Sequence, residues 1–210
     1  MRTRVKVCGF TRVDDAVAAA RMGIDALGLV FYPASPRYIE PDLAEKLVAA
    51  LPAFVSVVAL FVDEQETNIR RILQQVPVDC LQFHGNEPPE ACRIYHKPYI
   101  KALRVQESTE VMAQAKMYPD ACGLLLDAFQ ADAKGGTGHP FDWRLIPDNC
   151  PLPIILAGGL NADNARLAVA SVKPYALDVS SGVEAEKGIK DITKITAFLE
   201  AVSEGDRNKI

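Results

Sequence analysis

Two side chains of different acidity could pass protons to and from a substrate. Cys8 ends the apolar run 4–8, and Asp127 directly follows another apolar run at 121–126. A thiolate acts as a general base when a nearby cation lowers the thiol pKa, and Lys6 is a candidate for that cation or a structural partner inside the fold. A carboxylic acid donates a proton near neutral pH when burial or a neighbouring negative charge raises its pKa. The pair predicts acid–base chemistry, although free cysteines are commonly small buried hydrophobes and such aspartates commonly cap turns.

Arg37 and two glycine-bearing turns have the chemistry of an anion site. Arg37 follows two prolines in the segment 31–39, and a guanidinium held there can bind a carboxylate or phosphate through two hydrogen bonds, although most arginines are simply solvent-exposed. Main-chain N–H groups beside glycines at a helix start bind phosphate. The predicted phosphate-binding residues are Gly158, Gly159, Ser180, Ser181 and Gly182. A further glycine-rich stretch, residues 135–138, is a mobile lid, another phosphate contact or a plain flexible loop.

These residues occupy regular places in an alternation of strands and helices. Short β-branched apolar runs are followed by amphipathic stretches that begin with helix-starting residues. The predicted strands span residues 4–8, 25–30, 55–62, 78–83, 99–103, 121–126, 153–156 and 175–179. The predicted helices span residues 14–22, 42–51, 66–75, 88–95, 108–117, 142–145, 161–170 and 191–202. Repeated strand–helix units indicate a parallel sheet covered by helices.

Eight such units in 210 residues favour a closed barrel over an open sheet. The predicted fold is α/β, a single-domain (β/α)8 TIM barrel over residues 1–203, followed by a polar C-terminal tail at 204–210. Active sites of such barrels lie at the C-terminal ends of the strands. Because strand residues alternate in direction, the inward-pointing Gln82, His84 and Asp178 are predicted substrate contacts. For His84, a histidine that merely satisfies a turn is an equally good interpretation.

Composition excludes several other classes of function. A net charge of −4 and a pI near 5.4 give no general attraction to nucleic acid or an acidic membrane surface. No apolar run has transmembrane length, and the N-terminus lacks the apolar core of a signal peptide. The odd number of cysteines, 5, without a CxxC pair argues against a disulfide framework or a zinc site. We expect a cytoplasmic enzyme of small molecules, without a metal or cofactor; the sequence indicates no protein partner.

Seven short segments occur in order over residues 6–184, each at an expected strand end: KVCG, SPRYI, LQFHG, LLDAF, GGTG, LAGGL and DVSSGVE. With these segments the sequence resembles the phosphoribosylanthranilate isomerase family. Most of these segments are weak signals alone, but the ordered set is highly specific. Two departures, Val7 and Phe83, do not involve a proposed catalytic group.

The resemblance implies an Amadori rearrangement in tryptophan biosynthesis. N-(5′-phosphoribosyl)anthranilate becomes 1-(2-carboxyphenylamino)-1-deoxyribulose 5-phosphate, with the Asp127 position as general acid and the Cys8 position as general base. The Arg37 position is associated with the anthranilate carboxylate, and the loops of Gly159 and Ser181 with the phosphate. Such an isomerisation needs one acid and one base and no metal or redox cofactor.

Two alternatives remain at this level. Another phosphate-binding barrel enzyme, such as the sister isomerase of the histidine pathway, would place a carboxylate or lysine where this chain has Cys8. A catalytically silent barrel would bind a sugar phosphate without turning it over. The intact set of Cys8, Asp127 and Arg37 argues against lost activity.

Overall fold

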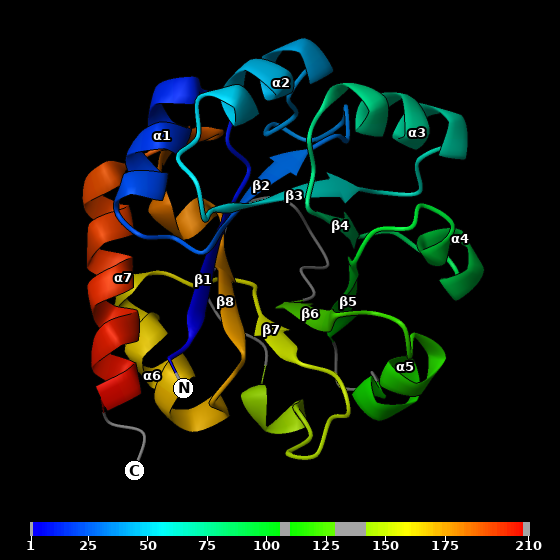
Figure 1. The fold of residues 1–210 in the computed structure, drawn as a ribbon. Coiled ribbons are helices and arrows are strands. Elements are labelled where there is room, and N and C mark those ends of the chain that lie inside the picture. The colour runs from blue at the N-terminus through cyan, green and yellow to red at the C-terminus, as the bar shows by residue number, and fades with distance from the viewer. Residues whose placement is uncertain (1, 106–109, 129–141, 208–210) are drawn as a thin grey trace.

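The computed structural model describes residues 2–105, 110–128 and 142–207. Its strands β1 to β8 form one closed parallel barrel in chain order, in which β8 pairs back with β1, and the helices lie outside it (Figure 1). The strands are Arg4–Cys8 (β1), Ala26–Val30 (β2), Ser56–Phe61 (β3), Cys80–Phe83 (β4), Tyr99–Val105 (β5), Gly123–Ala128 (β6), Ile154–Leu156 (β7) and Ala176–Val179 (β8). The predicted TIM barrel in a single domain is confirmed.

The helices follow the strands in the expected order. They are Val13–Arg21 (α1), Pro41–Ala49 (α2), Glu66–Gln75 (α3), Pro89–Arg93 (α4), Val111–Met117 (α5), Ala162–Val172 (α6) and Ile192–Arg207 (α7). The predicted helix near residues 142–145 is a single 3-10 turn, Trp143–Leu145 (η1), in which the Asp142 carboxylate accepts a hydrogen bond from the N–H of Arg144. In the described residues, η1 is the only helical segment between β6 and β7.

The alternation along the strands separates two packing layers. Val5 and Val7 belong to the large cluster between the strands and the helices, whereas Lys6 is buried on the other face of β1. The barrel interior holds a separate apolar cluster of Ile100, Ala102, Leu125, Ile155, Ala157 and Ala176. Because both faces of every strand are covered, near-continuous apolar runs are what the sequence must supply.

The acid candidate lies inside a strand, which differs from the sequence prediction. We expected β6 to end at Leu126, with Asp127 directly after it. β5 instead continues to Val105, and its last two residues pair with Asp127 and Ala128. The extra pairing fixes the main chain of Asp127 in the barrel wall and removes it from the loop.

The C-terminal helix extends beyond the predicted boundary at residue 203. α7 continues to Arg207, so the described part of the expected tail is helical. The carboxylate of Asp206 accepts hydrogen bonds from the main-chain N–H of Thr3 at 2.7 Å and from its hydroxyl at 2.8 Å. These bonds give the last turn of α7 a partner at the start of β1, which a frayed tail would lack.

A small hairpin after β8 was not predicted. A 3-10 turn, Ser181–Val183 (η2), leads into Glu184–Glu186 (β9), which pairs antiparallel with Ile189–Lys190 (β10). Gly188 has φ of 83° in the connecting turn, a conformation that favours glycine. Among the helices of the described residues, none combines the length and the apolar character that a membrane span requires.

Candidate active site

Cys8 lies buried at the C-terminal mouth of the barrel. Its side chain is 5% exposed and packs with Val30 and Leu60. Gly28 is its partner on β2, and a Cβ added there would lie 2.6 Å from the sulfur. Glycine at this position therefore makes the space in which the thiol sits.

The buried ion pair of Lys6 and Asp178 lies close to the Cys8 thiol. Lys6 Nζ donates to Asp178 Oδ1 at 2.8 Å, and both side chains are less than 10% exposed. Burial raises the pKa of the Cys8 thiol, and the positive charges of Lys6 and Lys190 oppose that rise without cancelling it. Lys6 thus serves both suggested purposes, since it is the structural partner of Asp178 and a cation near the thiol. The expected lowering of the thiol pKa below its usual value is not found, because desolvation is the larger effect.

Asp127 meets His84 across the mouth. His84 Nε2 lies 3.3 Å from Asp127 Oδ2, and the Asp127 side chain is 33% exposed. Behind it, the amide nitrogen of Gln82 lies 3.0 Å from His84 Nδ1. With this amide donating to Nδ1, Nε2 carries the hydrogen that faces Asp127. Gln82 is fully buried, so the structure places it behind the imidazole.

Arg37 reaches over the first strand. A Cβ on Gly9, whose φ is 84°, would lie 2.6 Å from Arg37 Cδ, so the glycine allows the arginine stem to lie next to Cys8. The guanidinium donates from Nε and Nη2 to the two oxygens of Glu184, each at 2.7 Å. This hydrogen bond raises the pKa of Arg37, which stays charged.

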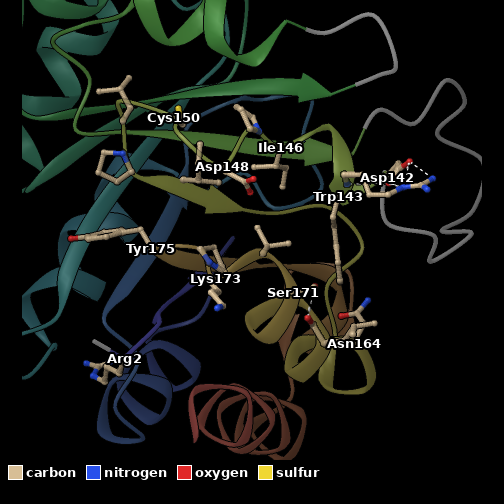
Figure 2. A pocket seen from close by; sticks show the side chains of 18 residues that line it. Arg2, Asp142, Trp143, Ile146, Asp148, Cys150, Asn164, Ser171, Lys173 and Tyr175 are labelled. Atoms are coloured by element: carbon tan, nitrogen blue, oxygen red, sulfur yellow. Dashed lines mark hydrogen bonds and ion pairs between the residues drawn. The ribbon is translucent and has the colours of Figure 1, made fainter. Parts of the chain in front are cut away.

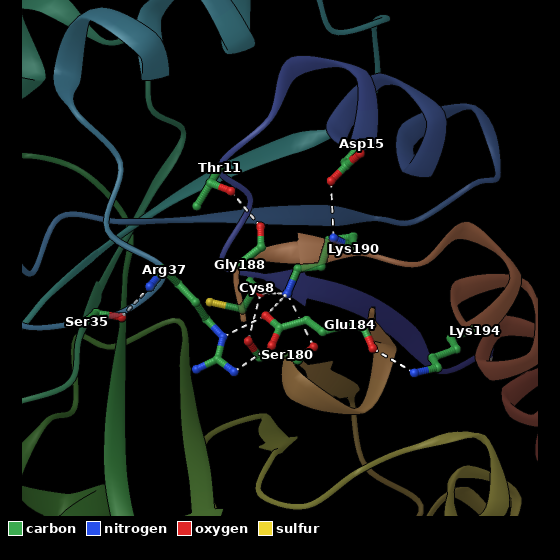
Figure 3. A network of polar contacts seen from close by, with 10 residues as sticks. All are labelled: Cys8, Thr11, Asp15, Ser35, Arg37, Ser180, Glu184, Gly188, Lys190 and Lys194. Atoms are coloured by element: carbon green, nitrogen blue, oxygen red, sulfur yellow. Dashed lines mark hydrogen bonds and ion pairs between the residues drawn. The ribbon is translucent and has the colours of Figure 1, made fainter. Parts of the chain in front are cut away.

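The side chain of Lys190 binds Cys8, Ser180 and Glu184 at once. Its wholly buried ammonium donates to the main-chain oxygen of Cys8 at 2.6 Å, to that of Ser180 at 3.3 Å and to Glu184 Oε1 at 2.9 Å (Figure 3). Ser180 Oγ donates to the same Cys8 oxygen at 2.9 Å. Burial lowers the pKa of Lys190, although the bond to Glu184 opposes this.

The two predicted phosphate turns lie against each other. Gly158 and Gly159 have φ of 83° and 68°, and they precede α6, whose start is capped by Asn161. A Cβ on Gly182 would lie 1.9 Å from the main-chain oxygen of Leu160. Glycine at 182 therefore lets the loop after β8 touch the loop after β7, as a shared anion site requires.

Comparison with known proteins establishes the relationship of this chain. The family model described as N-(5′phosphoribosyl)anthranilate (PRA) isomerase matches residues 5–201. The chain belongs to the N-(5′-phosphoribosyl)anthranilate isomerase family.

Several relatives match this isomerase family member over nearly their whole length. An N-(5′-phosphoribosyl)anthranilate isomerase of Nitrosococcus oceani is 53% identical, with 96% of this chain and 98% of the relative covered. The phosphoribosyl anthranilate isomerase structure from Thermotoga maritima has a TM-score of 0.88 at 40% identity, covering 96% of this chain and 98% of that one. Another isomerase structure holds reduced 1-(o-carboxyphenylamino)-1-deoxyribulose 5-phosphate, with a TM-score of 0.81 at 36% identity and the same coverage.

Sequence reasoning missed Glu184 and Lys190 in this family member. Glu184 was part of a quoted segment but was given no function, and Lys190 lay outside every segment. The signal available was the glycine turn at Gly188 between two short runs, which is typical of a hairpin that would bring the two side chains together. The predicted lid or phosphate contact at residues 135–138 lies outside the described residues.

A large cleft lies away from these groups. It measures about 1310 Å³ and is lined by η1, by the segment before β7 and by α6, including Trp143, Leu152, Asn164 and Tyr175 (Figure 2). It opens on the outer wall near the starts of β7 and β8, and its lining includes none of the predicted site residues. In the described part of the chain, no group of three or more His, Cys, Asp or Glu side chains is arranged to hold a metal ion.

Proposed function

We propose that the chain converts N-(5′-phosphoribosyl)anthranilate to 1-(2-carboxyphenylamino)-1-deoxyribulose 5-phosphate in tryptophan biosynthesis, with Cys8 as general base and Asp127 as general acid. Membership of the isomerase family supports the reaction. The observation that supports the roles is a buried thiol and a partly exposed carboxyl group at one mouth of the barrel. An aldose–ketose rearrangement needs one group of each kind.

The first step belongs to the acid. Asp127 in its protonated form gives a proton to the ring oxygen of the ribose, the C1′–O bond breaks, and the nitrogen lone pair forms a protonated Schiff base. His84 Nε2 lies 3.3 Å from the same carboxyl group, so the imidazole limits the directions in which Asp127 can point. A positioned acid of this kind contributes roughly 10²–10⁴ in rate.

The second step belongs to the base. The Cys8 thiolate removes the proton from C2′, the electron pair forms the C1′–C2′ double bond, and the Schiff base nitrogen becomes neutral. The resulting enolamine tautomerises to the ketone. Because burial raises the pKa of Cys8, its thiolate is a stronger base than an exposed one and a smaller fraction of it is ionised at neutral pH.

The remaining site residues bind the two anionic ends of the substrate. Arg37 binds the anthranilate carboxylate through Nη1 and the second hydrogen of Nη2, because Nε and the first hydrogen of Nη2 are taken by Glu184. The turns of Gly158 and Gly159 and of Ser180, Ser181 and Gly182 take the phosphate through main-chain N–H groups. Asp178 acts through Lys6, and Gln82 through His84. The proposed ligand is thus a small phosphoribosyl compound, and the proposed place of the reaction is the cytoplasm.

The test is a fluorescence assay of phosphoribosylanthranilate consumption by the purified protein, with Cys8→Ala in parallel. We expect rapid loss of the signal with the wild type and a rate lower by roughly 10³-fold or more with the variant. A folded wild type that leaves the substrate unchanged would contradict the proposed reaction. The phosphoribosyl substrate of the histidine pathway would then be assayed. An active Cys8→Ala variant would contradict only the role of the base.

A further inference from the structure

Glu184 and Lys190 form a buried ion pair that the steps above do not use. They stand opposite each other in the β9–β10 hairpin, with Nζ and Oε1 2.9 Å apart. The Lys190 side chain is 0% exposed and that of Glu184 is 6% exposed. Removing two charges from water is costly unless good geometry and further hydrogen bonds offset the loss. Both conditions are met here, and the further bonds of the two charged groups go to Arg37, Cys8 and Ser180.

Glu184 binds one edge of the Arg37 guanidinium and leaves another edge free. Its two oxygens accept from Nε and Nη2, the side edge of the group. Among the described residues, none accepts a hydrogen bond from Nη1. Figure 3 shows that end of the guanidinium turned away from Glu184. The end edge, formed by Nη1 and the second hydrogen of Nη2, can therefore still bind a carboxylate with two hydrogen bonds.

Lys190 connects the same carboxylate to the base. Its ammonium group donates to the main-chain oxygen of Cys8 and to that of Ser180, so it ties the end of β1 to the loop after β8. The main-chain N–H of Lys190 donates to Asp15 on α1 at 3.1 Å, which anchors the hairpin from the outside. The arginine, the base and the phosphate loop thus share one buried cation and its counter-ion.

We propose that Glu184 and Lys190 are positioning residues of the isomerisation: Glu184 aims the free edge of Arg37 at the substrate carboxylate, and Lys190 fixes the main chain that carries Cys8. The proposal rests on the proposed function, because it assigns the ligand of Arg37. It predicts that the two residues affect different kinetic parameters, since one acts on binding and the other on the base.

The first experiment compares Glu184→Gln with Glu186→Gln, an exposed position on the same hairpin. For Glu184→Gln we expect KM for phosphoribosylanthranilate to rise about 10-fold, with kcat within about twofold of wild type. Glu186→Gln should change neither parameter. A role in stability alone would lower the amount of active enzyme and leave KM unchanged, so an unchanged KM in Glu184→Gln overturns the role of Glu184.

Glu184→Gln leaves the buried ammonium without its counter-ion and could fail to fold. The double variant Glu184→Gln/Lys190→Met removes both charges with little change in volume, which buried ion pairs tolerate better than loss of one partner. The same rise in KM is expected from the double variant. Restoration of most of the affinity by Glu184→Asp would agree with a carboxylate that orients Arg37. A wild-type KM in the double variant would overturn the proposal.

A second readout follows Lys190 without any turnover. The charged groups around the Cys8 thiol include Lys6, Asp178, Lys190 and Arg37, and the positive charge of Lys190 lowers the thiol pKa. The rate of Cys8 alkylation by iodoacetamide should therefore rise at higher pH in Lys190→Met than in wild type. An unshifted profile overturns the role of Lys190. If the wild type lacks isomerase activity, the proposed function fails, whereas this profile still reports on the cation.

A separate observation concerns two thiols at the opposite mouth of the barrel. Cys80 begins β4 and Cys122 directly precedes β6, and their sulfur atoms lie 3.9 Å apart. Cys122 is exposed and Cys80 is half-buried. The contact with Cys80 lowers the pKa of the Cys122 thiol, which favours Cys122 as the attacking thiol of the pair. A reactive exposed thiol next to a second thiol is the arrangement of redox-active cysteine pairs.

We infer that Cys122 is a site of thiol–disulfide exchange with Cys80 as its resolving partner. The Cys122 thiolate attacks one sulfur of a low-molecular-weight disulfide, forms a mixed disulfide and releases one thiol. Cys80 then loses its proton and attacks the Cys122 sulfur, which releases the second thiol and closes the internal disulfide. Two protein thiols are oxidised and one small disulfide is reduced to two thiols. The sulfur atoms must approach to about 2.05 Å, which requires a local shift.

Oxidised glutathione tests this inference by intact mass. The wild type should lose two hydrogen atoms without retaining an adduct, and Cys80→Ser should stop at the mixed disulfide. Cys122→Ser should stay reduced, whereas Cys150→Ser, which removes another half-buried thiol, should behave as wild type. A wild type that stays reduced, or that keeps the adduct as Cys80→Ser does, overturns the inference.

Discussion

The two halves of the catalytic mouth are built differently. The base side encloses Cys8 between Gly28, the Lys6–Asp178 pair and the buried cation Lys190. On the acid side, a third of the Asp127 side chain is exposed, and Asp127 Oδ2 lies 3.3 Å from the nitrogen of a half-buried imidazole.

The two sides differ in how many buried charged groups surround the catalytic side chain. Groups fixed in a dry interior act on each other strongly and need no rearrangement during the reaction, whereas an exposed carboxyl group is screened by water. The base side therefore depends on neighbours in several strands and loops. We expect the acid side to depend mainly on the carboxyl group itself, and four changes test this contrast.

The largest effect is expected on the acid side. Asp127→Asn keeps the shape of the side chain and removes the proton donor, so kcat should fall by roughly 10²–10⁴-fold with little change in KM. The fluorescence assay measures the rate, and circular dichroism checks the fold. If this variant kept the wild-type kcat, Asp127 would not be the proton donor and His84 would be the next candidate. The contrast between the two sides of the mouth would then not hold.

On the base side, a change beside Cys8 should have a smaller but clear effect. Gly28→Ala places a Cβ 2.6 Å from the sulfur, so the thiol must move or the strands must separate. We expect kcat to fall about 10–100-fold and the free energy of unfolding to fall by about 1–3 kcal/mol. Urea unfolding measures the second quantity. The control is Gly123→Ala, whose Cβ lies 3.1 Å from a main-chain oxygen near the other mouth. An equal loss of kcat in the control would show that the effect is not local.

The pH dependence of the rate reports on the enclosure of the thiol. Burial raises the pKa of Cys8, so the protonated thiol predominates at neutral pH and the thiolate fraction grows as pH rises. We therefore expect kcat/KM to rise with pH through neutrality, by at most about tenfold per unit. The rate of Cys8 alkylation should rise with pH over the same range. A thiol that is already ionised below neutrality would give a flat profile and contradict the described environment.

The smallest effect is expected at the neighbour of the acid. His84→Asn removes the imidazole nitrogen that lies 3.3 Å from the Asp127 carboxyl group at a partly exposed site. Such a contact is worth about 1 kcal/mol or less, which corresponds to a loss of about fivefold in kcat at most. His96→Asn, at a turn position with φ of 53°, is the control. A loss as large as that in Asp127→Asn would mean that the imidazole takes part in proton transfer.

The sequence predicted the barrel because its signals are local and repeated. Apolar runs with helix starts between them identified all of β1 to β8, and alternation along β1 correctly placed Lys6 on the face opposite to Val5 and Val7. The end of β6 was wrong because its last pairs depend on the length of β5, which no local pattern shows.

The functional assignments of the site residues stay predictions, but the location of several of them could be read from the sequence. Cys8 and Asp127 lie near strand ends and Arg37 in the loop after β2, and the structure brings Cys8 and Arg37 together over Gly9. The Glu184–Lys190 pair depends on a hairpin of short strands, whose pairing is weak in the sequence and is fixed by contacts with Asp15 and Cys8. The sign of the Cys8 pKa shift also needed the burial that only the fold supplies.

The bonds between Thr3 and Asp206 have a consequence for rearranging the chain. They hold the beginning of β1 and the end of α7 together at the mouth opposite to Cys8 and Asp127. A short linker could therefore join these ends, and new ends could be opened in an exposed loop on the same side, as circular permutation requires. Because the barrel is closed, the chain could begin at a different strand while every strand keeps its neighbours. The catalytic mouth lies at the opposite end of the barrel from the new linker.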